Sequence, residues 1–463
     1  MSRVEGRVYP VRLIELVLAS AVMFLVTFAQ TTAVFGWAPV RWAEVNALPH
    51  VALLISGPVA GVLGAFAART CTTALVTSAP GREWRDITRR QLAPLAGAAC
   101  LGFVLGMAPA VILATRRATY GQGDILGLCT GSVGLILCVV IGYAVGATVR
   151  FPRSAAIALA VSILATGGLM GLSDFLTASG LRASLLAVIP FWAFDISRGW
   201  VEIPSTTLFR GFTLIAFVGL VLCILRVGRD INWLSRRERT GQLVLGASAP
   251  LLMVVLALVV QPDVVRAARP TPIECTSLAS GDLCMYAEES AVLAESSEIV
   301  DDVHARFGLG ASTGRTWSVR PEDLTSGSQT GDTFITPQYQ GTHENFEESL
   351  RGDIVASIAG VRACEVILYD EYGIDYYNSA PAAELESAVF QEMIANSMVF
   401  RLGGTKVEGI VLPEDNAEAG WPRSAELSNR IGSMTDNELA QWIRANAAAL
   451  ESCSARTDNL EQG

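Results

Sequence analysis

The sequence predicts an α-helical polytopic membrane protein with about seven transmembrane helices, an N-terminus inside, and a C-terminal α+β extracytoplasmic domain. Of the 463 residues, 51% are hydrophobic and 17% charged, whereas soluble proteins average about 25% charged residues. The mean hydropathy is +0.42. The charge also changes sign at Pro262: residues 1–262 carry 21 arginines and 11 acids, whereas residues 263–463 carry 13 basic and 33 acidic residues. We therefore expect a transmembrane domain at 1–262 and an extracytoplasmic α+β domain at 263–463.

Apolar stretches long enough to cross a bilayer, roughly 20 residues each, recur through the first domain. Seven of them predict spans, at residues 13–36, 51–68, 92–115, 125–148, 154–176, 207–225 and 243–260. A shorter apolar piece at 183–194 is interrupted by Pro190, and it predicts a re-entrant or interfacial helix on the outer side.

Arginine counts predict the orientation, because short cytoplasmic loops carry the Lys/Arg excess. With the N-terminus inside, 15 of the 21 arginines of the first domain lie in cytoplasmic segments and 6 in outer segments. Seven spans then place the acidic domain outside the cell membrane. We expect no cleaved signal peptide, because the first apolar segment is too long and has no small-residue cleavage pattern.

Four of the nine cysteines follow the last span: Cys275, Cys284, Cys364 and Cys453. An even number in an extracytoplasmic domain predicts two disulfides. Of the three possible pairings we favour Cys275 with Cys284 and Cys364 with Cys453. The alternative is four free buried thiols.

Ionisable residues are nearly absent from the spans. Glu15, Asp124, Asp174 and Arg210 lie at or near span ends, where we expect interfacial side chains that reach water. This favours a conduit or tether operated by another subunit over a self-powered carrier. The chain has a single lysine, Lys406, without the glycine spacing of a phosphate-binding loop, so a separate protein would have to bind any ATP.

The segment between the second and third spans, residues 68–90, holds five arginines and one tryptophan. Two readings stay open: an amphipathic cytoplasmic helix that docks on a partner, or an arginine-rich turn that only fixes topology. The candidate partner-binding residues are Arg82, Trp84, Arg85, Arg89 and Arg90.

The acidic domain predicts strands at 282–286, 316–319, 366–369 and 407–412, and helices at 287–307, 343–359, 382–402 and 436–452. The segments 326–341 and 413–424 predict loops. One helix starts with His343 and Glu344, with Glu347 one turn later and Glu365 soon after. This pattern is similar to the H-E-x-x-H zinc motif of gluzincin metallopeptidases, with Glu347 in place of the second histidine. His343, Glu347 and Glu365 are therefore weak metal candidates, and a solvated acidic helix face is the simpler interpretation.

The arrangement of the predicted spans and of the outer domain resembles that of ABC transporter permeases of the type-two exporter class. It resembles in particular actinobacterial permease-like proteins with an extra last span and an extracytoplasmic domain. The resemblance includes the segments 281–289 (GDLCMYAEE) and 439–446 (LAQWIRAN). It implies a non-catalytic subunit of an export or resistance system, with a permease-like first domain and an outer domain that senses or gates substrate. A cytoplasmic ATPase would bind the 68–90 segment, and the chain would pair with a copy of itself or with a second permease. No cofactor and no nucleic acid are expected. The alternative is an outer domain, degenerate metallopeptidase-like or ligand-binding, that the spans merely anchor.

Overall fold

The computed structural model divides the chain into two compact units. The first comprises Met1–Phe35 and Val40–Arg269, and the second comprises Gly36–Pro39 and Pro270–Gly463. The structure describes residues 11–68, 88–149, 152–164, 200–229, 236–260, 265–267, 272–307, 315–319, 333–335, 342–364, 367, 382–403 and 424–456.

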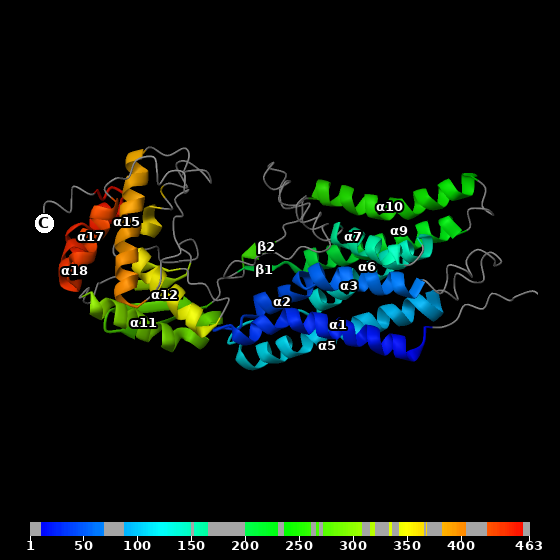
Figure 1. The fold of residues 1–463 in the computed structure, drawn as a ribbon, viewed down its shortest axis with the longest axis horizontal. Helices are drawn as coiled ribbons and strands as arrows, with labels where there is room; N and C mark the ends of the chain where they lie inside the picture. Colours follow the sequence, from blue (N-terminus) through cyan, green and yellow to red (C-terminus); the bar gives the residue numbers. More distant parts are fainter. Residues whose placement is uncertain are drawn as a thin grey trace, which may run out of the picture. The chain divides into compact units, whose positions relative to one another are not determined.

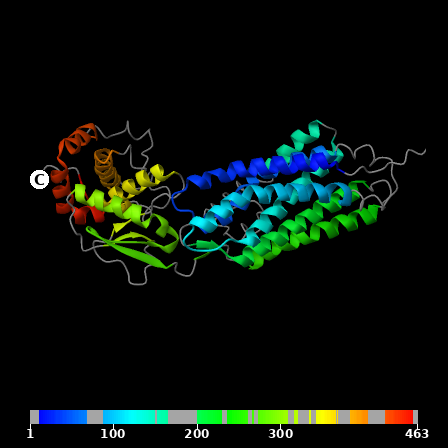
Figure 2. The same cartoon turned by 90° about the horizontal axis from the view of Figure 1, so that it is seen from below.

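The first unit is built from long apolar helices that run side by side (Figures 1 and 2). Its described helices are α1 (Leu13–Thr31), α2 (Trp42–Val51), α3 (Leu53–Ala68), α5 (Ala93–Arg117), α6 (Ile125–Thr148), α7 (Arg153–Ile163), α9 (Pro204–Arg229) and α10 (Arg236–Val260). A 3-10 turn, η1 (Thr32–Gly36), extends α1, and a π turn, η2 (Thr88–Leu92), precedes α5.

Six helical segments among the described residues are long and apolar enough to cross a membrane, which indicates a multi-pass membrane protein. They correspond to six of the seven predicted spans. For the remaining one, at 154–176, the structure describes only α7 and Leu164, and the predicted outer helix at 183–194 lies outside the described residues. The prediction for the second span was wrong at its start: α2 and α3 form one apolar segment from Trp42 to Ala68, so the span begins nine residues before Val51.

Successive helix ends meet in the alternating order expected of a chain that crosses back and forth. At one end, the Val11 amide donates to the carbonyl of Arg90, over 3.3 Å. At the opposite end, Asn46 Nδ2 donates to the carbonyl of Gln122, over 3.0 Å. Strand β1 (Trp200–Glu202), before α9, pairs there with β2 (Val265–Ala267), after α10. Within the first unit, α1 therefore starts at one end of the bundle and β2 lies at the other.

Small residues let the spans pack with their backbones in contact. A Cβ atom at Gly142 of α6 would overlap the backbone of Gly61 in α3. Between α1 and α5, Thr31 Oγ1 donates to the carbonyl of Gly106, over 3.2 Å. Such close approach is a usual source of helix association in lipid, where burial of apolar area contributes little.

The second unit contains a four-stranded sheet with order β3-β4-β5-β6. Its strands are β3 (Ile273–Leu278), β4 (Gly281–Tyr286), β5 (Arg315–Ser318) and β6 (Thr333–Phe334). The β3–β4 pair is an antiparallel hairpin, and β4–β5 and β5–β6 are parallel. Helical elements follow the sheet or connect its strands: η6 (Ala287–Val292), α11 (Leu293–Arg306), α12 (His343–Ile358), α15 (Ala382–Arg401), α17 (Ser424–Ser433), α18 (Asp436–Ala445) and α19 (Ala447–Glu451).

Strand β4 contributes to a core on each face of the sheet, because successive side chains of a strand point to opposite faces. Leu283 and Met285 belong to the main core, which α11, α12, α15 and α18 complete. Cys284 and Tyr286 belong to a smaller cluster with Trp317.

The predicted strands at 282–286 and 316–319 correspond to β4 and β5, which supports the α+β class. Strands β3 and β6 were not predicted, and β6 falls within the stretch 326–341 that was expected to be a loop. Of the predicted strand at 366–369 the structure describes only Ile367, which is helical. The predicted strand at 407–412 lies outside the described residues.

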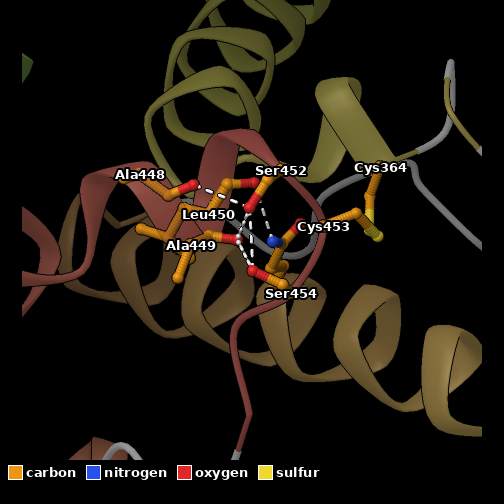
Figure 3. The surroundings of a disulfide bond; sticks show 8 residues. Cys364, Ala448, Ala449, Leu450, Ser452, Cys453 and Ser454 are labelled. Atoms are coloured by element: carbon orange, nitrogen blue, oxygen red, sulfur yellow. Dashed lines mark hydrogen bonds between the residues drawn. A yellow bond between two sulfur atoms is a disulfide. The ribbon is translucent and has the colours of Figure 1, made fainter.

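Both favoured cysteine pairs are at disulfide distance. Cys275 and Cys284 are directly opposed across the β3–β4 hairpin, with Cα atoms 4.1 Å apart. Cys364, after α12, joins Cys453, after α19, with Cα atoms 4.8 Å apart. Figure 3 shows the second pair beside Ser452 and Ser454, which hydrogen-bond to the end of α19. Two disulfides in this unit are compatible with an extracytoplasmic location.

Candidate functional site

The second span contains a buried histidine beside a helix interruption. α2 ends at Val51, α3 begins at Leu53, and Pro49 lies inside the last turn of α2. A proline inside a helix removes one backbone hydrogen bond and favours a kink. His50 lies at this point, is 1% exposed, and neither of its ring nitrogens forms a hydrogen bond with the residues that the structure describes. Within the part of the chain that the structure describes, a polar ring is thus buried without hydrogen-bond partners.

Arg210 of α9 is the second member of the cluster. Its side chain is fully buried, and the residues next to Arg210 and His50 both pack on α6, because Gly211 lies beside Thr130 and Pro49 lies beside Gly131. The prediction that Arg210 is an interfacial residue was wrong, because α9 begins at Pro204 rather than Thr207 and places Arg210 six positions inside the helix. A buried arginine in an apolar bundle is costly, and such residues commonly mark substrate or ion pathways.

Two threonines complete the cluster and connect α6 to α9. Thr130 Oγ1 donates to the carbonyl of Leu126, over 2.9 Å, and approaches the carbonyl of Thr207 at 3.4 Å. Gly211 lies against Thr130, since a Cβ there would come within 3.4 Å of Oγ1. We call His50, Thr130, Thr207 and Arg210 the polar cluster.

The polar cluster lies at one depth in the bundle. α2, α6 and α9 all start at the end of the unit where Asn46 meets Gln122 and β1 meets β2. At 1.5 Å per residue, His50, Thr130 and Arg210 are roughly 8 to 12 Å from the starts of their helices.

A buried ion pair lies at the start of the same span. Arg41, at the N-cap of α2, pairs with Glu44, and both side chains are 7% exposed. A carboxylate in the first turn suits the positive end of the helix dipole. Arg41 directly precedes Trp42, where the apolar segment begins, so this pair is buried at the end of the bundle.

The candidate partner-binding residues lie mostly outside the described residues. Arg82, Trp84 and Arg85 fall in the stretch 69–87. Arg89 and Arg90 belong to the π turn η2, where Arg90 is exposed. Residues 88–90 therefore continue directly into the α5 span, and the rest of the predicted docking segment remains a prediction.

The weak metal candidates are engaged separately in the described structure. His343 Nδ1 lies 3.3 Å from Glu295 Oε2, and Glu347 Oε2 lies 3.4 Å from Arg351. No group of three His, Cys, Asp or Glu side chains suited to a metal occurs among the described residues, and Glu365 lies outside them. The zinc-site prediction gains no support from this geometry.

Comparison with protein-family models, with curated proteins and with solved structures yields no match to this chain.

Proposed function

We propose that this chain is the non-catalytic transmembrane subunit of an export system that a separate cytoplasmic ATPase energises, and that the polar cluster contacts the transported molecule. The observation that carries the proposal is the burial of His50 and Arg210 in the apolar bundle. Transmembrane helices that only anchored the protein would not need such residues, because placing their side chains in hydrocarbon costs several kcal/mol of free energy.

The interruption between α2 and α3 supports the same role. Non-helical or broken backbone at membrane depth is tolerated where it is enclosed by protein or lines a pathway. In many transporters the substrate site lies at discontinuous helices. His50 is one residue before the end of α2 and therefore lies directly beside this interruption.

The need for a separate ATPase follows from the lysine content and from the resemblance to type-two exporter permeases. The only lysine, Lys406, belongs to the acidic C-terminal region, so the chain has no phosphate-binding loop of the G-x-x-x-x-G-K-[ST] kind. In the resembling class, the segment after the second span contacts the ATPase, which assigns that contact to residues 82–90 here. A homodimer or a pair with a second permease would complete the transporter.

The proposal is tested by purifying the tagged full chain from its native membrane in mild detergent and identifying bound proteins by mass spectrometry. We expect an ATPase in equal amount, and its loss in a Trp84→Ala, Arg85→Ala double variant. Arg116→Ala is the matched control, because Arg116 is an exposed arginine at the opposite end of α5. Recovery of the chain without any ATPase would contradict the proposal, as would equal recovery with the double variant.

A further inference from the structure

A small pocket lies between α2, α5 and α6, at the end of the bundle where α2 and α6 start. Its volume is about 70 Å³, which is well below the several hundred Å³ of a typical drug-binding pocket. The pocket therefore takes the end group of a ligand and not a whole drug-sized molecule.

The walls of the pocket are apolar apart from two side chains. Pro49, Met107, Val111 and Leu128 line it, together with the indole of Trp42. The polar exceptions are Asn46 and Asp124. An apolar wall with one aromatic ring and one carboxylate is complementary to a cation that carries methyl groups.

Hydrogen bonds between α2 and the loop before α6 hold Asn46 and Asp124 in place. The Asp124 amide donates to Asn46 Oδ1, over 2.8 Å, and Asp124 Oδ1 accepts from the Leu126 amide, also over 2.8 Å. Among the described residues no donor occupies Asp124 Oδ2. The loop also packs on the indole, since a Cβ at Gly123 would lie 3.0 Å from Trp42. The pocket is thus formed before a ligand arrives, which limits the entropy lost on binding.

We propose that this pocket binds the methylated ammonium end of an amphiphile, with the charge against Asp124 and the methyl groups against Trp42 and the apolar wall. The apolar chain of the ligand extends into the surrounding lipid. Such an ammonium is present in choline lipids and in free quaternary alkylammonium compounds. The chemistry of the pocket is independent of whether the chain transports anything, so failure of the ATPase experiment would leave it standing.

The test measures equilibrium binding of radiolabelled decyltrimethylammonium to the purified full chain in dodecyl maltoside, with empty micelles subtracted. Asp124→Asn keeps an oxygen for the α6 cap, because asparagine is as good an N-cap as aspartate, and it removes the charge. We expect binding at least about tenfold weaker in this variant. Val111→Phe fills the pocket, and we expect it to abolish saturable binding.

Glu15→Gln is the matched control, because Glu15 is an acid in the first turn of α1 at the opposite end of the bundle. This variant should bind as the wild type does. Size-exclusion chromatography and thermal unfolding of each variant show that loss of binding does not reflect misfolding.

Competition identifies the source of the ammonium group. Displacement by phosphatidylcholine supports the pocket as a lipid-headgroup site, and displacement by decyltrimethylammonium but not by phosphatidylcholine supports it as a site for soluble amphiphiles. Wild-type affinity in both Asp124→Asn and Val111→Phe would overturn the proposal, as would equal competition by neutral decyl glucoside.

Discussion

Gln391 of α15 donates from Nε2 to the backbone carbonyl oxygen of Leu450 in α19, over 2.9 Å and 59 positions of sequence. Gly360, with φ of +78°, packs against the same carbonyl, where a Cβ would meet the Leu450 backbone. Three residues further along, Cys453 is bonded to Cys364. A hydrogen bond, a close backbone contact and a disulfide therefore attach the end of α19 to the core of the second unit.

The disulfides predict a specific thiol count. Nine cysteines are present and four are paired. Four others are free among the described residues, and Cys71, which lies outside them, is expected to be free as well. Maleimide labelling of the denatured chain without reductant should add five groups, and after reduction nine. Nine groups before reduction would show that neither disulfide forms.

Loss of the long-range disulfide should be more harmful than loss of the hairpin disulfide. Cys364 and Cys453 are separated by 89 positions, whereas Cys275 and Cys284 are separated by 9. The chain-entropy model gives about 4 to 5 kcal/mol for the longer loop and about 2 to 3 kcal/mol for the shorter one. We expect Cys364→Ser, Cys453→Ser to unfold at lower denaturant concentration than Cys275→Ser, Cys284→Ser. The reverse order would contradict the role of the longer bridge in holding α19.

Sequence patterns were sufficient for the disulfide pairing and for most of the spans. Proximity favoured Cys275 with Cys284, which are 9 positions apart. The second pair was favoured because it would tie the terminal helix to the core of the domain. Apolar runs located the spans because a bilayer imposes a minimum length.

The polar cluster could not be found in the same way. Pro49, His50 and the charged Arg41 and Glu44 lower the local hydropathy, so the pattern placed the start of the span at Val51. In the structure, α2 begins at Trp42 and includes Glu44, Pro49 and His50, whose side chains are buried. A proline and a histidine directly before an apolar run could have indicated the earlier start of this span. Averaging the hydropathy over a window hides such a pair. Strand β6 was missed for a different reason: its two residues pair with β5 but carry no alternating pattern of their own.

Asp436 predicts a dependence of stability on acid. The hydrogen bond from Arg401 Nη1, 2.8 Å away, is the main cause that holds the pKa of Asp436 below its ordinary value of 3.8, and Arg306 at 3.3 Å adds to it. A lowered pKa in the folded state gives stability that is present above pH 3.8 and is lost as the pH falls through the folded-state pKa. The contribution stays below about 1 kcal/mol because the pair is partly exposed.

The matched variant is Asp436→Asn. Thermal unfolding of the full chain in detergent should show the wild type more stable than this variant at pH 7, with the gap closing as the pH falls below 3.8. A difference in thermal stability between the two proteins that is constant from pH 7 to pH 3 would show that the ion pairs with Arg401 and Arg306 contribute nothing to stability.

Backbone contact between α3 and α6 predicts a strong effect of a single methyl group. Gly142→Ala places a Cβ against the Gly61 backbone, and overpacking of this kind costs about 1 to 3 kcal/mol. Gly219→Ala is the control, because nothing lies within 4 Å of a Cβ at that position of α9. The thermal midpoint in detergent should fall for Gly142→Ala and stay or rise slightly for Gly219→Ala. Equal midpoints would contradict the close approach of α3 and α6.

The two ends of α6 predict the sidedness of the membrane unit. Gln122, before the helix, and Thr148, its last residue, are both exposed. With the N-terminus inside, Gln122→Cys should react with a membrane-impermeant maleimide added to intact cells, and Thr148→Cys should react only after permeabilisation. Labelling of Thr148→Cys alone in intact cells would reverse the orientation and place the disulfide-bonded unit in the cytoplasm.

The central claim is that the polar cluster contacts the transported molecule in a subunit driven by the proposed ATPase, and one measurement addresses it directly. The complex purified with its ATPase is reconstituted in nanodiscs, and ATP hydrolysis is measured for the wild type, for His50→Ala, and for Leu245→Ala, a change at an exposed apolar residue of α10. We predict that His50→Ala still binds the ATPase but hydrolyses ATP at least about tenfold more slowly, while Leu245→Ala matches the wild type. Wild-type hydrolysis by a stably assembled His50→Ala complex would contradict the claim.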